Sequence, residues 1–484
     1  MPGVSPDQPP PGLEQLRLFN TRTRRVERFQ PREPGKVGIY TCGPTVYAPQ
    51  HIGNMRSQFL PDILRRVLIA AGYDVNLVTN ITDVGHLVGD LDDGDDKMEV
   101  AARSSGRSAA EIAAHFTAQW ADDRRRLGML EPDLLPCAAA HIPEQIAMIE
   151  QLEAGGHTYV IDDGVYFDVS TFPTYADFAR LDLDDQDTTG RIDNVAAKRH
   201  PADFALWKRS PEGVQRQQEW ESPWGRGFPG WHIECSAMAT KYLGRQFDIH
   251  TGGVDHIGVH HTNEIAQSES ALGVHPWVDV WMHNEFLDLG GEKMSKSTGN
   301  LYVVQDLVDR GFDPLAFRYF LLQAHYRQQQ AFTFDALEAA ATAYRRLVGH
   351  AVRARDAAAG AVDPARVEPE RRRFWEAMAD DLNAPQALAV ASRVAKSADL
   401  PAIDRWWLLA DFDRVLGFGF ADAVDPESVD EATGTDEVID GRVAEREAAR
   451  QRRDFTTADR IRDELAAEGV VLVDTPTGAT WRRS

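Results

Sequence analysis

Four residues in this chain carry side chains that bind soft divalent metal ions: Cys42, Cys235, His260 and Glu264. Two thiolates, an imidazole and a carboxylate together suit a tetrahedral zinc ion. The last two residues stand four apart, so one face of a helix can present both. The two cysteines lie far apart and form no Cys-x-x-Cys pair, so spacing alone does not join the set. Taken singly, each cysteine fits a buried small apolar residue, and the His–Glu pair fits a solvated helix face.

A second group of residues could bind phosphate. The stretch from Val37 to Leu60 has the pattern of a strand, a Gly-Pro turn and the start of a helix, and His51, Gly53 and Asn54 fall at that helix start. A helix N-terminus attracts anions, and a glycine lets a bulky anion approach the backbone. A short His-x-Gly match also arises by chance, so this pattern alone leaves the site open.

Two lysines follow a glycine pair later in the chain. Lys293 and Lys296 belong to the run Lys-Met-Ser-Lys-Ser, directly after Gly290-Gly291. On a flexible loop, two lysines among small hydroxyl residues can gather phosphate oxygens as charge develops during a reaction. The alternative interpretation is a solvated basic loop.

Two further stretches could complete a pocket. Gly252, Gly253 and Asp255 follow an expected strand end, a pattern typical of a nucleotide ribose site, although a plain turn has the same composition. Trp231 stands four residues before Cys235 and could form the wall of a small pocket, or it could pack in the core as most tryptophans do.

A parallel sheet is expected to position these residues. Alternating β-forming residues predict strands at Val37–Thr41 and Val75–Ile81, and apolar residues at helical spacing predict a helix between them. This strand–helix–strand unit is half of a doubly wound sheet, whose strand ends carry ligands. Thr82 falls at such a strand end.

The pattern changes in the middle of the chain. Helical patterns at 109–127 and 142–154 and a hairpin at 158–169 interrupt the sheet, which we expect to resume near 203–208. Beyond residue 304 the chain turns helical and predicts a bundle. Residues 421–440 contain eight acidic residues and no Lys or Arg, which is typical of a linker.

Composition narrows the class of protein. The 484 residues carry a formal charge of −23, which argues against nonspecific coating of nucleic acid. The sequence contains no apolar run of about 20 residues, so we expect no membrane span. Three cysteines are too few for a disulfide framework, and the N-terminus has no signal-peptide pattern, so a reducing cytoplasm fits best.

Longer motifs add a family resemblance: TCGPTVYAPQHIGN, NITDV, DFALWK, GFPGWHIECSAM, GVHHTNEIAQSE, WMHNEFLDLGGEKMSKSTGN, DDLNAPQAL and FTTADRIRDELAAEGV. HIGN followed by KMSKS on a doubly wound pattern resembles the class I aminoacyl-tRNA synthetases, and the full set resembles the cysteinyl-tRNA synthetases from about residue 16 to 482. The resemblance implies an α/β fold: a Rossmann-like catalytic domain with an insertion domain, a helical bundle and a small C-terminal mixed domain. It implies that ATP activates L-cysteine to cysteinyl-adenylate, which then esterifies the 3′ end of tRNA(Cys).

By this resemblance, the four metal-binding residues hold one zinc ion that takes the substrate thiolate in an open position. Cysteine and serine differ by one atom, and an apolar pocket separates such pairs by only about 1–3 kcal/mol. A metal–thiolate bond separates them further, because the serine hydroxyl stays protonated near neutral pH. Trp231 is expected to flank the amino acid, while Thr82 and Asp255 place its backbone or the adenosine.

The resemblance also implies an ATP site. His51 and Asn54 would bind phosphates and stabilise the pentavalent centre as the cysteine carboxylate attacks the α-phosphate. Lys293 and Lys296 would cover the β- and γ-phosphates and the leaving pyrophosphate, with Lys296 the main contact. ATP would enter with Mg²⁺, and no covalent protein intermediate is needed.

Two motifs depart from the family pattern. The HIGH motif ends in Asn54, which can still donate to phosphate but carries no charge, so we expect activity to persist. In the HHENE motif Thr262 replaces an acid that is not an implied ligand. The stretch Gly85–Asp96 is also longer than the usual family version.

The resemblance implies this division of the chain: first half of the catalytic domain at 1–83, insertion domain at 84–200, second half of the catalytic domain at 201–285, KMSKS loop and stem-contact region at 286–333, helical tRNA-binding bundle at 334–420, acidic linker at 421–440 and anticodon-recognition domain at 441–484. The expected partners are tRNA(Cys), L-cysteine and ATP, with no membrane. We expect a cytoplasmic monomer.

Arginines recur at helical spacing in the last segment, at Arg442, Arg446, Arg450 and Arg453. We expect them to form one helix face that contacts tRNA phosphates, although a solvated helix has the same pattern. Trp481 could stack on a base or pack.

Two other functions stay open: a cysteine ligase for a small amine, and a catalytically silent tRNA-binding paralogue. The basic C-terminal helix argues against the first, and the intact site residues argue against the second.

Overall fold

A computed structural model describes residues 9–85, 97–181, 197–210, 213, 216–289, 292–293, 301–426, 437–452, 454–468, 470–475 and 478–483. Most of the acidic stretch Gly85–Asp96, the Lys-Met-Ser-Lys-Ser loop from residue 294 onward, and the centre of the expected linker therefore lie outside the described residues. The N-terminal part opens with a hairpin of β1 (Arg17–Asn20) and β2 (Arg25–Arg28).

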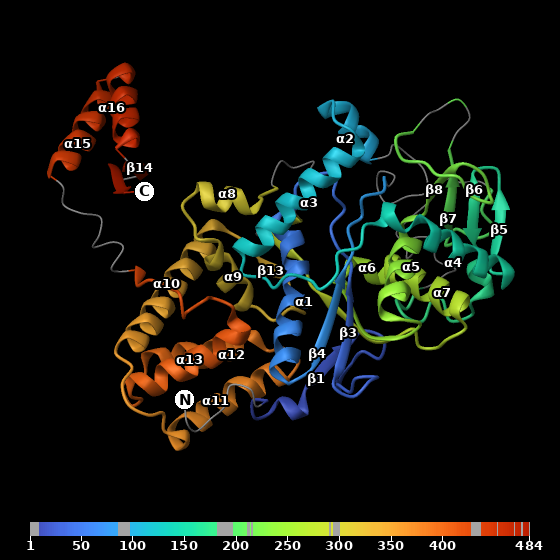
Figure 1. Ribbon diagram of the computed structural model, residues 1–484, viewed down its shortest axis with the longest axis horizontal. Coiled ribbons are helices and arrows are strands. Elements are labelled where there is room, and N and C mark those ends of the chain that lie inside the picture. Colours follow the sequence, from blue (N-terminus) through green and yellow to red (C-terminus); the bar gives the residue numbers. More distant parts are fainter. Residues whose placement is uncertain are drawn as a thin grey trace.

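A four-stranded parallel sheet lies in the middle of the structure (Figure 1). Its strands, in spatial order, are β10 (Val278–Asn284), β9 (Phe247–Gly253), β3 (Lys36–Thr41) and β4 (Asp74–Thr79). β3 pairs with β4 on one side and with β9 on the other, where Thr41 is the register partner of Thr251. The strand order therefore reverses at β3. The carboxyl ends of β3 and β9 flank this switch point, which is where doubly wound sheets bind ligands.

Helix α1 (Ile52–Ala70) connects β3 to β4. It begins after His51, whose side chain accepts a hydrogen bond from the Asn54 backbone N–H, while the Asn54 side chain accepts from the His51 N–H. This reciprocal cap satisfies two donors at the helix start. The apolar residues at helical spacing are all buried: Ile52, Met55, Phe59, Ile63 and Val67.

Between the two halves of the parallel sheet the chain forms helices and an antiparallel sheet. The elements are α2 (Lys97–Ser105), α3 (Ala109–Arg126), α4 (Ile142–Ala154), β5 (Thr158–Ile161), β6 (Gly164–Phe167), β7 (Phe204–Arg209) and β8 (Gly227–Pro229). The expectation that the strand near 203–208 rejoins the parallel sheet is wrong, because β7 pairs antiparallel with β6 and β8. All residues of β7 but the last are buried, and a strand buried on both faces has the same apolar pattern in either sheet.

Helices α5 (Trp231–Leu243), α6 (Asp255–Gly258) and α7 (His260–Leu272) surround the carboxyl ends of β3 and β9. α5 and α7 pack against each other, and the short α6 joins the end of β9 to α7. α7 ends at Gly273, whose φ of 63° is the left-handed conformation that glycine adopts at little cost. The loop from β9 and the helix α7 thus bring several histidines to one place.

A small sheet and a helical bundle follow. The sheet has the order β12 (Glu292–Lys293), β11 (Leu287–Leu289), β13 (Gln330–Ala331). The helices are α8 (Val304–Asp309), α9 (Pro314–Leu322), α10 (Phe334–Asp356), α11 (Pro364–Ala379), α12 (Ala384–Lys396) and α13 (Ala402–Leu416). Figure 1 shows them on one side of the parallel strands and the antiparallel sheet on the other. α13 contacts α1, so one hydrophobic core extends from the sheet into the bundle.

The C-terminal part contains α15 (Glu437–Gln451), α16 (Phe455–Ala467) and the hairpin of β14 (Val470–Thr475) and β15 (Gly478–Arg483). Its buried apolar residues form a separate cluster: Ile439, Val443, Ile461, Leu465, Val470 and Trp481. The predicted fold class is confirmed, with a doubly wound α/β region, a helical bundle and a small mixed C-terminal part. None of the described helices combines the length and the apolar character needed to cross a membrane.

Candidate active site

The turn after β3 fixes the backbone of Cys42. Its N–H donates to the Thr251 carbonyl at 3.4 Å, and its own carbonyl accepts from Gln58 Nε2 at 3.2 Å. The next residue, Gly43, donates its N–H to Asn80 Oδ1 at 2.9 Å. A Cβ on Gly43 would lie 1.6 Å from the Asn80 carbonyl oxygen, so only glycine fits. β9, α1 and the end of β4 therefore hold this cysteine in place together.

The four side chains predicted as metal ligands converge in the structure: Cys42, Cys235, His260 and Glu264. One potential ligand atom from each lies within 4.8 Å of the others, and all four residues are buried. His260 Nε2 is 2.9 Å from Glu264 Oε1, and the Cys42 sulfur is 3.8 Å from the same oxygen. α7 supplies the His–Glu pair, α5 supplies Cys235 and the turn after β3 supplies Cys42. Two thiols, an imidazole and a carboxylate in one buried place are a donor set that fits zinc.

Charge within this group is balanced by its neighbours. Burial alone would raise the pKa of Glu264, but His250 and His260 outweigh it and lower the pKa to about 2. Burial also acts to lower the pKa of His260, yet the Glu264 carboxylate and the Cys235 thiol raise it to about 10. A metal ligand imidazole is neutral, so an ion bound here takes the place of the His260 proton.

The four potential ligands Cys42, Cys235, His260 and Glu264, called the metal-binding group below, lie at the edge of a cavity of about 380 Å³. Cys42, Cys235 and His260 contribute to its lining. Predicted residues of the other sets share the same lining: His51, Asn54, Thr82, Trp231, Gly252, Gly253 and Asp255. The volume is in the range of small-molecule sites. Residues from separate parts of the chain thus face one space.

The wall of the cavity depends on two glycines. A Cβ on Gly252 would lie 2.6 Å from His261 Cε1, and one on Gly253 would lie 2.4 Å from Asp255 Oδ1. The glycine pair therefore lets α6 and α7 approach the end of β9. Trp231, the first residue of α5, packs beside the metal-binding group, with its ring centroid 4.4 Å from that of His260 and the two ring planes tilted by 45°.

The start of α1 forms another part of the lining. His51 Nδ1 accepts from the Asn54 N–H at 3.2 Å, and Asn54 Oδ1 accepts from the His51 N–H at 3.2 Å. Gly53 lies in this first turn, which contains no acidic residue, so no carboxylate offsets the positive end of the helix dipole. The two predicted lysines are not placed at the cavity by the structure. Lys293 is the last residue of β12, and only its backbone is described, while Lys296 lies outside the described residues.

Sequence reasoning missed several residues behind the predicted ligands. Thr82 Oγ1 accepts from Asn80 Nδ2 at 3.0 Å, so Asn80 links it to the Gly43 turn. His250 Nε2 donates to Glu264 Oε2 at 3.1 Å. His261 Nε2 lies 3.4 Å from the Cys42 sulfur. The His-His pair at 260–261 was a visible signal for His261, and Asn80 stands at the same expected strand end as Thr82, whereas nothing local marked His250.

The C-terminal arginines do not form the single open face that was expected. Arg442 Nη1 donates to Glu468 Oε1 at 2.7 Å and its Nη2 to Glu464 Oε2 at 2.9 Å. Arg446 is buried, and Arg450 is exposed. Arg453, the fourth member of the predicted face, lies outside the described residues.

Trp481 packs in the structure. It is buried in the C-terminal core, and its Nε1 donates to Asp440 Oδ1 at 2.6 Å. Of the two interpretations left open by the sequence, packing is the one observed.

Comparison with protein families gives two matches. Residues 28–342 match the model of the tRNA synthetases class I (C) catalytic domain. Residues 436–482 match the model of the cysteinyl-tRNA ligase anticodon binding domain. The first match includes the cavity and the second the C-terminal core.

Curated relatives match along nearly the whole chain. A cysteine–tRNA ligase 1 of Burkholderia lata is 48% identical, over 96% of this chain and 96% of its own. Cysteine–tRNA ligases of Novosphingobium aromaticivorans and Treponema denticola are 42% and 41% identical; the first match covers 96% of this chain and 97% of the relative, and the second covers 97% and 99%.

Solved structures agree in fold. A Mycobacterium tuberculosis methionyl-tRNA synthetase in complex with methionyl-adenylate superposes with a TM-score of 0.54 at 18% identity, covering 81% of this chain and 92% of that one. A ternary complex of Agrobacterium radiobacter LeuRS, tRNA and LeuAMS gives 0.56 at 13% identity, covering 80% and 83%.

Proposed function

This chain belongs to the cysteine–tRNA ligases of class I, and from that membership we propose how its own residues select cysteine and activate it. The two alternatives considered from the sequence, a small-amine ligase and a silent paralogue, are not favoured. Relatives named cysteine–tRNA ligase match the C-terminal segment as well as the catalytic domain.

We propose that Cys42, Cys235, His260 and Glu264 hold one zinc ion and that this ion faces the substrate. A bound zinc ion supplies a soft Lewis acid that binds a thiolate far better than a hydroxyl. The residues support this by their placement: two thiols and an imidazole line the cavity, while Glu264 stays ionised behind them. Selectivity over serine then needs no second, hydrolytic site.

The other wall residues place the rest of the amino acid. Trp231 stands against His260 and limits the space beside the metal-binding group, which suits a side chain as small as that of cysteine. Thr82 and Asp255 line the same cavity and offer oxygens to an α-ammonium group or a ribose hydroxyl. Gly252 and Gly253 line the same cavity, so their backbone at the end of β9 can contact the nucleotide.

ATP is proposed to bind across the start of α1. His51, Gly53 and Asn54 present the positive helix end to the phosphates, and Lys293 and Lys296 cover the β- and γ-phosphates with Mg²⁺. A cysteine carboxylate oxygen attacks the α-phosphorus, the bond to the β-phosphate oxygen breaks, and pyrophosphate leaves. The protein contributes position and charge and forms no covalent bond.

Transfer to tRNA completes the reaction. A ribose hydroxyl at the 3′ end of tRNA(Cys) attacks the cysteinyl carbonyl, and AMP leaves. The helical bundle at 334–420 and the C-terminal domain at 441–484 are proposed to hold the tRNA, with the domain boundaries given from the sequence. A cytoplasmic monomer remains our proposal for the state of the enzyme, and three free cysteines support a reducing compartment.

The convergence of four distant side chains beside the cavity carries this proposal. ATP–pyrophosphate exchange with cysteine or serine, followed by charging of tRNA(Cys), tests it. Cys235→Ser should raise the KM for cysteine at least tenfold and lower zinc content, with little change in the KM for ATP. Cys137→Ser is the matched control, because Cys137 is the third free cysteine and does not belong to the metal-binding group. Unchanged zinc and cysteine kinetics in Cys235→Ser would remove this residue from the metal-binding group.

A further inference from the structure

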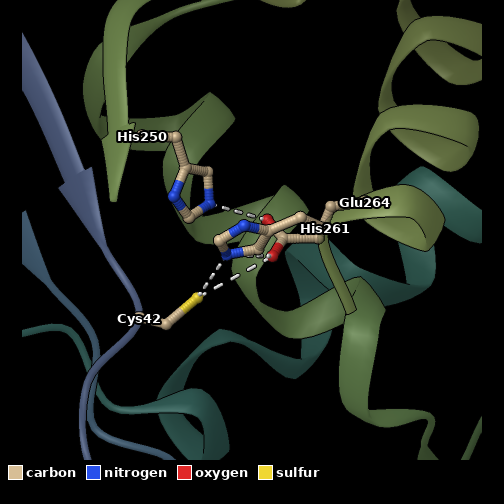
Figure 2. A group of neighbouring side chains, drawn as sticks. All are labelled: Cys42, His250, His261 and Glu264. Carbon is tan, nitrogen blue, oxygen red and sulfur yellow. Dashed lines mark hydrogen bonds and ion pairs between the residues drawn. The ribbon is translucent and has the colours of Figure 1, made fainter. Parts of the chain in front are cut away.

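Cys42 and Glu264 belong to a second group of four potential ligands. The group consists of Cys42, His250, His261 and Glu264, drawn in Figure 2. One ligand atom from each again lies within 4.8 Å of the others, and all four residues are buried. We call this the inner set and the group with Cys235 and His260 the open set. Both sets use the same thiol and the same carboxylate.

The spacing of the inner set suits a metal ion. In a tetrahedral zinc site with bonds of about 2.0–2.3 Å, neighbouring ligand atoms lie about 3.3–3.6 Å apart. The Cys42 sulfur is 3.4 Å from His261 Nε2 and 3.8 Å from Glu264 Oε1. His261 Nε2 is 3.9 Å from Glu264 Oε1, and His250 Nε2 is 3.1 Å from Glu264 Oε2. The widest separation in the set is at most 4.8 Å, so an ion would draw the four side chains together by up to about 1.5 Å at the longest pair.

A hydrogen-bond chain orients His261 from behind. Its Nδ1 lies 2.7 Å from His283 Nε2, and His283 Nδ1 lies 2.7 Å from the Thr21 hydroxyl. The Thr21 N–H donates to the Trp281 carbonyl at 2.8 Å, which anchors the chain to β10. Metal-binding histidines commonly use their second nitrogen in this way, so that the first points at the ion. Figure 2 shows His261 Nε2 facing both Cys42 and Glu264.

The two sets differ in access to substrate. The open set contributes Cys42, Cys235 and His260 to the lining of the cavity, whereas His250, His261 and Glu264 are absent from that lining among the described residues. An ion in the inner set would have protein ligands on all sides and no position for a substrate thiolate. The inner set also has one thiol and two imidazoles in place of two thiols and one imidazole. Metals that favour nitrogen ligands, such as Ni²⁺ and Co²⁺, should therefore occupy the inner set more readily than zinc does.

We propose that the chain has two alternative metal positions that share Cys42 and Glu264: the open one that meets the substrate, and a closed inner one held by His250 and His261. In this proposal one ion per chain occupies either position, and a count of two ions per unmodified chain would instead show that Cys42 and Glu264 bridge both. An ion in the inner position stays bound to the protein, but a substrate thiolate cannot reach it, so cysteine cannot bind to the metal. This proposal rests on the metal role proposed above, because the open set provides two of its ligands.

Metal content and Co²⁺ absorption of the full-length protein test the two positions. The variants are Cys235→Ala, which disables the open set, His261→Asn, which disables the inner set, and the double variant. Each is dialysed against a chelator-buffered series of free Co²⁺ and, separately, Zn²⁺. Bound metal is counted, and thiolate-to-cobalt charge transfer reports how many sulfurs are bound. Thermal unfolding confirms that each variant is folded.

Two sets predict a specific result. Cys235→Ala should still bind one ion per chain, with the charge transfer of one thiolate in place of two, and adding His261→Asn should weaken that binding at least tenfold. His256→Asn in the Cys235→Ala background is the matched control, because this nearby histidine belongs to neither set and should leave the metal bound.

Three distinguishable outcomes would contradict either the proposed function or the inner position. If the unmodified chain binds no metal, the proposed function itself fails. If it binds metal but Cys235→Ala does not, only the inner position fails. If Cys235→Ala binds an ion that His261→Asn leaves unchanged, His261 merely donates an N–H to the Cys42 thiolate, and the inner position is again excluded.

Discussion

Asn54 has two tasks at the start of α1. Its Oδ1 accepts the His51 N–H and so belongs to the helix cap, while its side chain lines the cavity that is proposed to bind ATP. With the oxygen engaged, the Nδ2 amide is the donor that remains for a phosphate. An amide carries no charge, so it acts through direction and proximity, in addition to the helix dipole. In this proposal the Asn54 oxygen contributes to the stability of the helix, and the Asn54 amide nitrogen contributes to the rate of adenylate formation.

Asn54→Ala is expected to lower stability and rate by separable amounts. Loss of the oxygen that accepts the His51 N–H should cost about 0.5–1.5 kcal/mol of unfolding free energy, the net contribution of one hydrogen bond. Loss of one donor to the transferring phosphate should slow adenylate formation about 10²-fold, because such donors act where charge develops. Urea unfolding and single-turnover adenylate formation measure the two effects.

Glu111→Ala provides the matched control. Glu111 has in the cap of α3 the position that Asn54 has in α1, because its Oε2 accepts from the Ser108 N–H at 2.8 Å, and it is absent from the cavity lining among the described residues. This variant should lose comparable stability and keep its rate. A similar rate loss in both variants would show that Asn54 acts only through the helix.

Asp123 is a buried carboxylate that opposes folding at neutral pH. It is 2% exposed, its Oδ2 has no hydrogen-bond partner, and burial raises its pKa from 3.8 to about 6. Between these values the unfolded chain has released a proton that the folded chain still holds, so stability falls as pH rises through this window. Above pH 6 the loss is complete.

Asp123→Asn should therefore stabilise the protein at pH 7 and not below pH 4. The expected gain is about 1–3 kcal/mol, from a pKa difference of about two units at 1.36 kcal/mol each. Urea unfolding of both proteins at pH 4, 5, 6 and 7 measures it. A gain that is equal at all four pH values would contradict the assignment to ionisation.

At the scale of elements, a buried ion pair joins α1 to the helical bundle. Arg318 on α9 and Asp62 on α1 are fully buried and lie 2.8 Å apart. Arg318 also donates to the carbonyls of Leu127, after α3, and Leu416, at the end of α13. Burial acts to raise the pKa of Asp62, but Arg318 and Arg66 lower it below the usual value, so the carboxylate stays charged. The Arg318 guanidinium therefore connects α9 to α1, to the residue after α3 and to the end of α13.

Arg318→Met should destabilise the protein by about 1.5–3 kcal/mol, because Asp62 loses one charged hydrogen bond and keeps only Arg66, whose Nε lies 3.1 Å away. The double variant with Asp62→Asn should recover part of that loss, since a neutral amide oxygen can still accept from Arg66 and from the Leu130 N–H. Denaturant unfolding of the single and double variants forms the cycle. A double variant less stable than Arg318→Met would argue that the pair is not the source of the loss.

An exposed ion pair in the same bundle is the control for this cycle. Arg372 and Glu368 lie 3.0 Å apart on α11, with side chains about half exposed. Arg372→Met should change stability by only about 0–1 kcal/mol, because water screens the pair. Equal losses at Arg318 and Arg372 would mean that burial does not decide the effect.

At the scale of the molecule, local patterns predicted most of the elements. The helices predicted at 109–127 and 142–154 match α3 and α4 to within one residue, and the strand at Val37–Thr41 differs by one residue. Periodicity is a property of neighbouring residues, so a single sequence contains it. The family motifs then placed the site residues, because they join segments that periodicity treats separately.

Long-range pairing could not be predicted in the same way. β7 pairs with β6 and β8 in the antiparallel sheet, and a strand that is buried along almost its whole length gives no sign of which sheet it enters. His250 and the Arg318–Asp62 pair were missed for a related reason. A buried polar residue is recognisable only by its partner, and these partners lie on other elements.

The last prediction concerns the C-terminal part, because its hydrophobic core is separate from the core of the sheet and the helical bundle. Every residue of that core lies between Ile439 and Trp481, and the core is a cluster distinct from the one that includes α1 and the bundle. Ending the chain at Pro426 therefore removes no buried contact of the cavity among the described residues. The shortened protein should keep cysteine-dependent ATP–pyrophosphate exchange within about twofold, since adenylate formation needs only the cavity. Its kcat/KM for charging tRNA(Cys) should fall about 100-fold, which corresponds to about 2.7 kcal/mol of lost binding. An equal fall in both assays would show that the catalytic domain depends on the C-terminal part for its own fold, and unchanged charging would show that this part does not hold the tRNA.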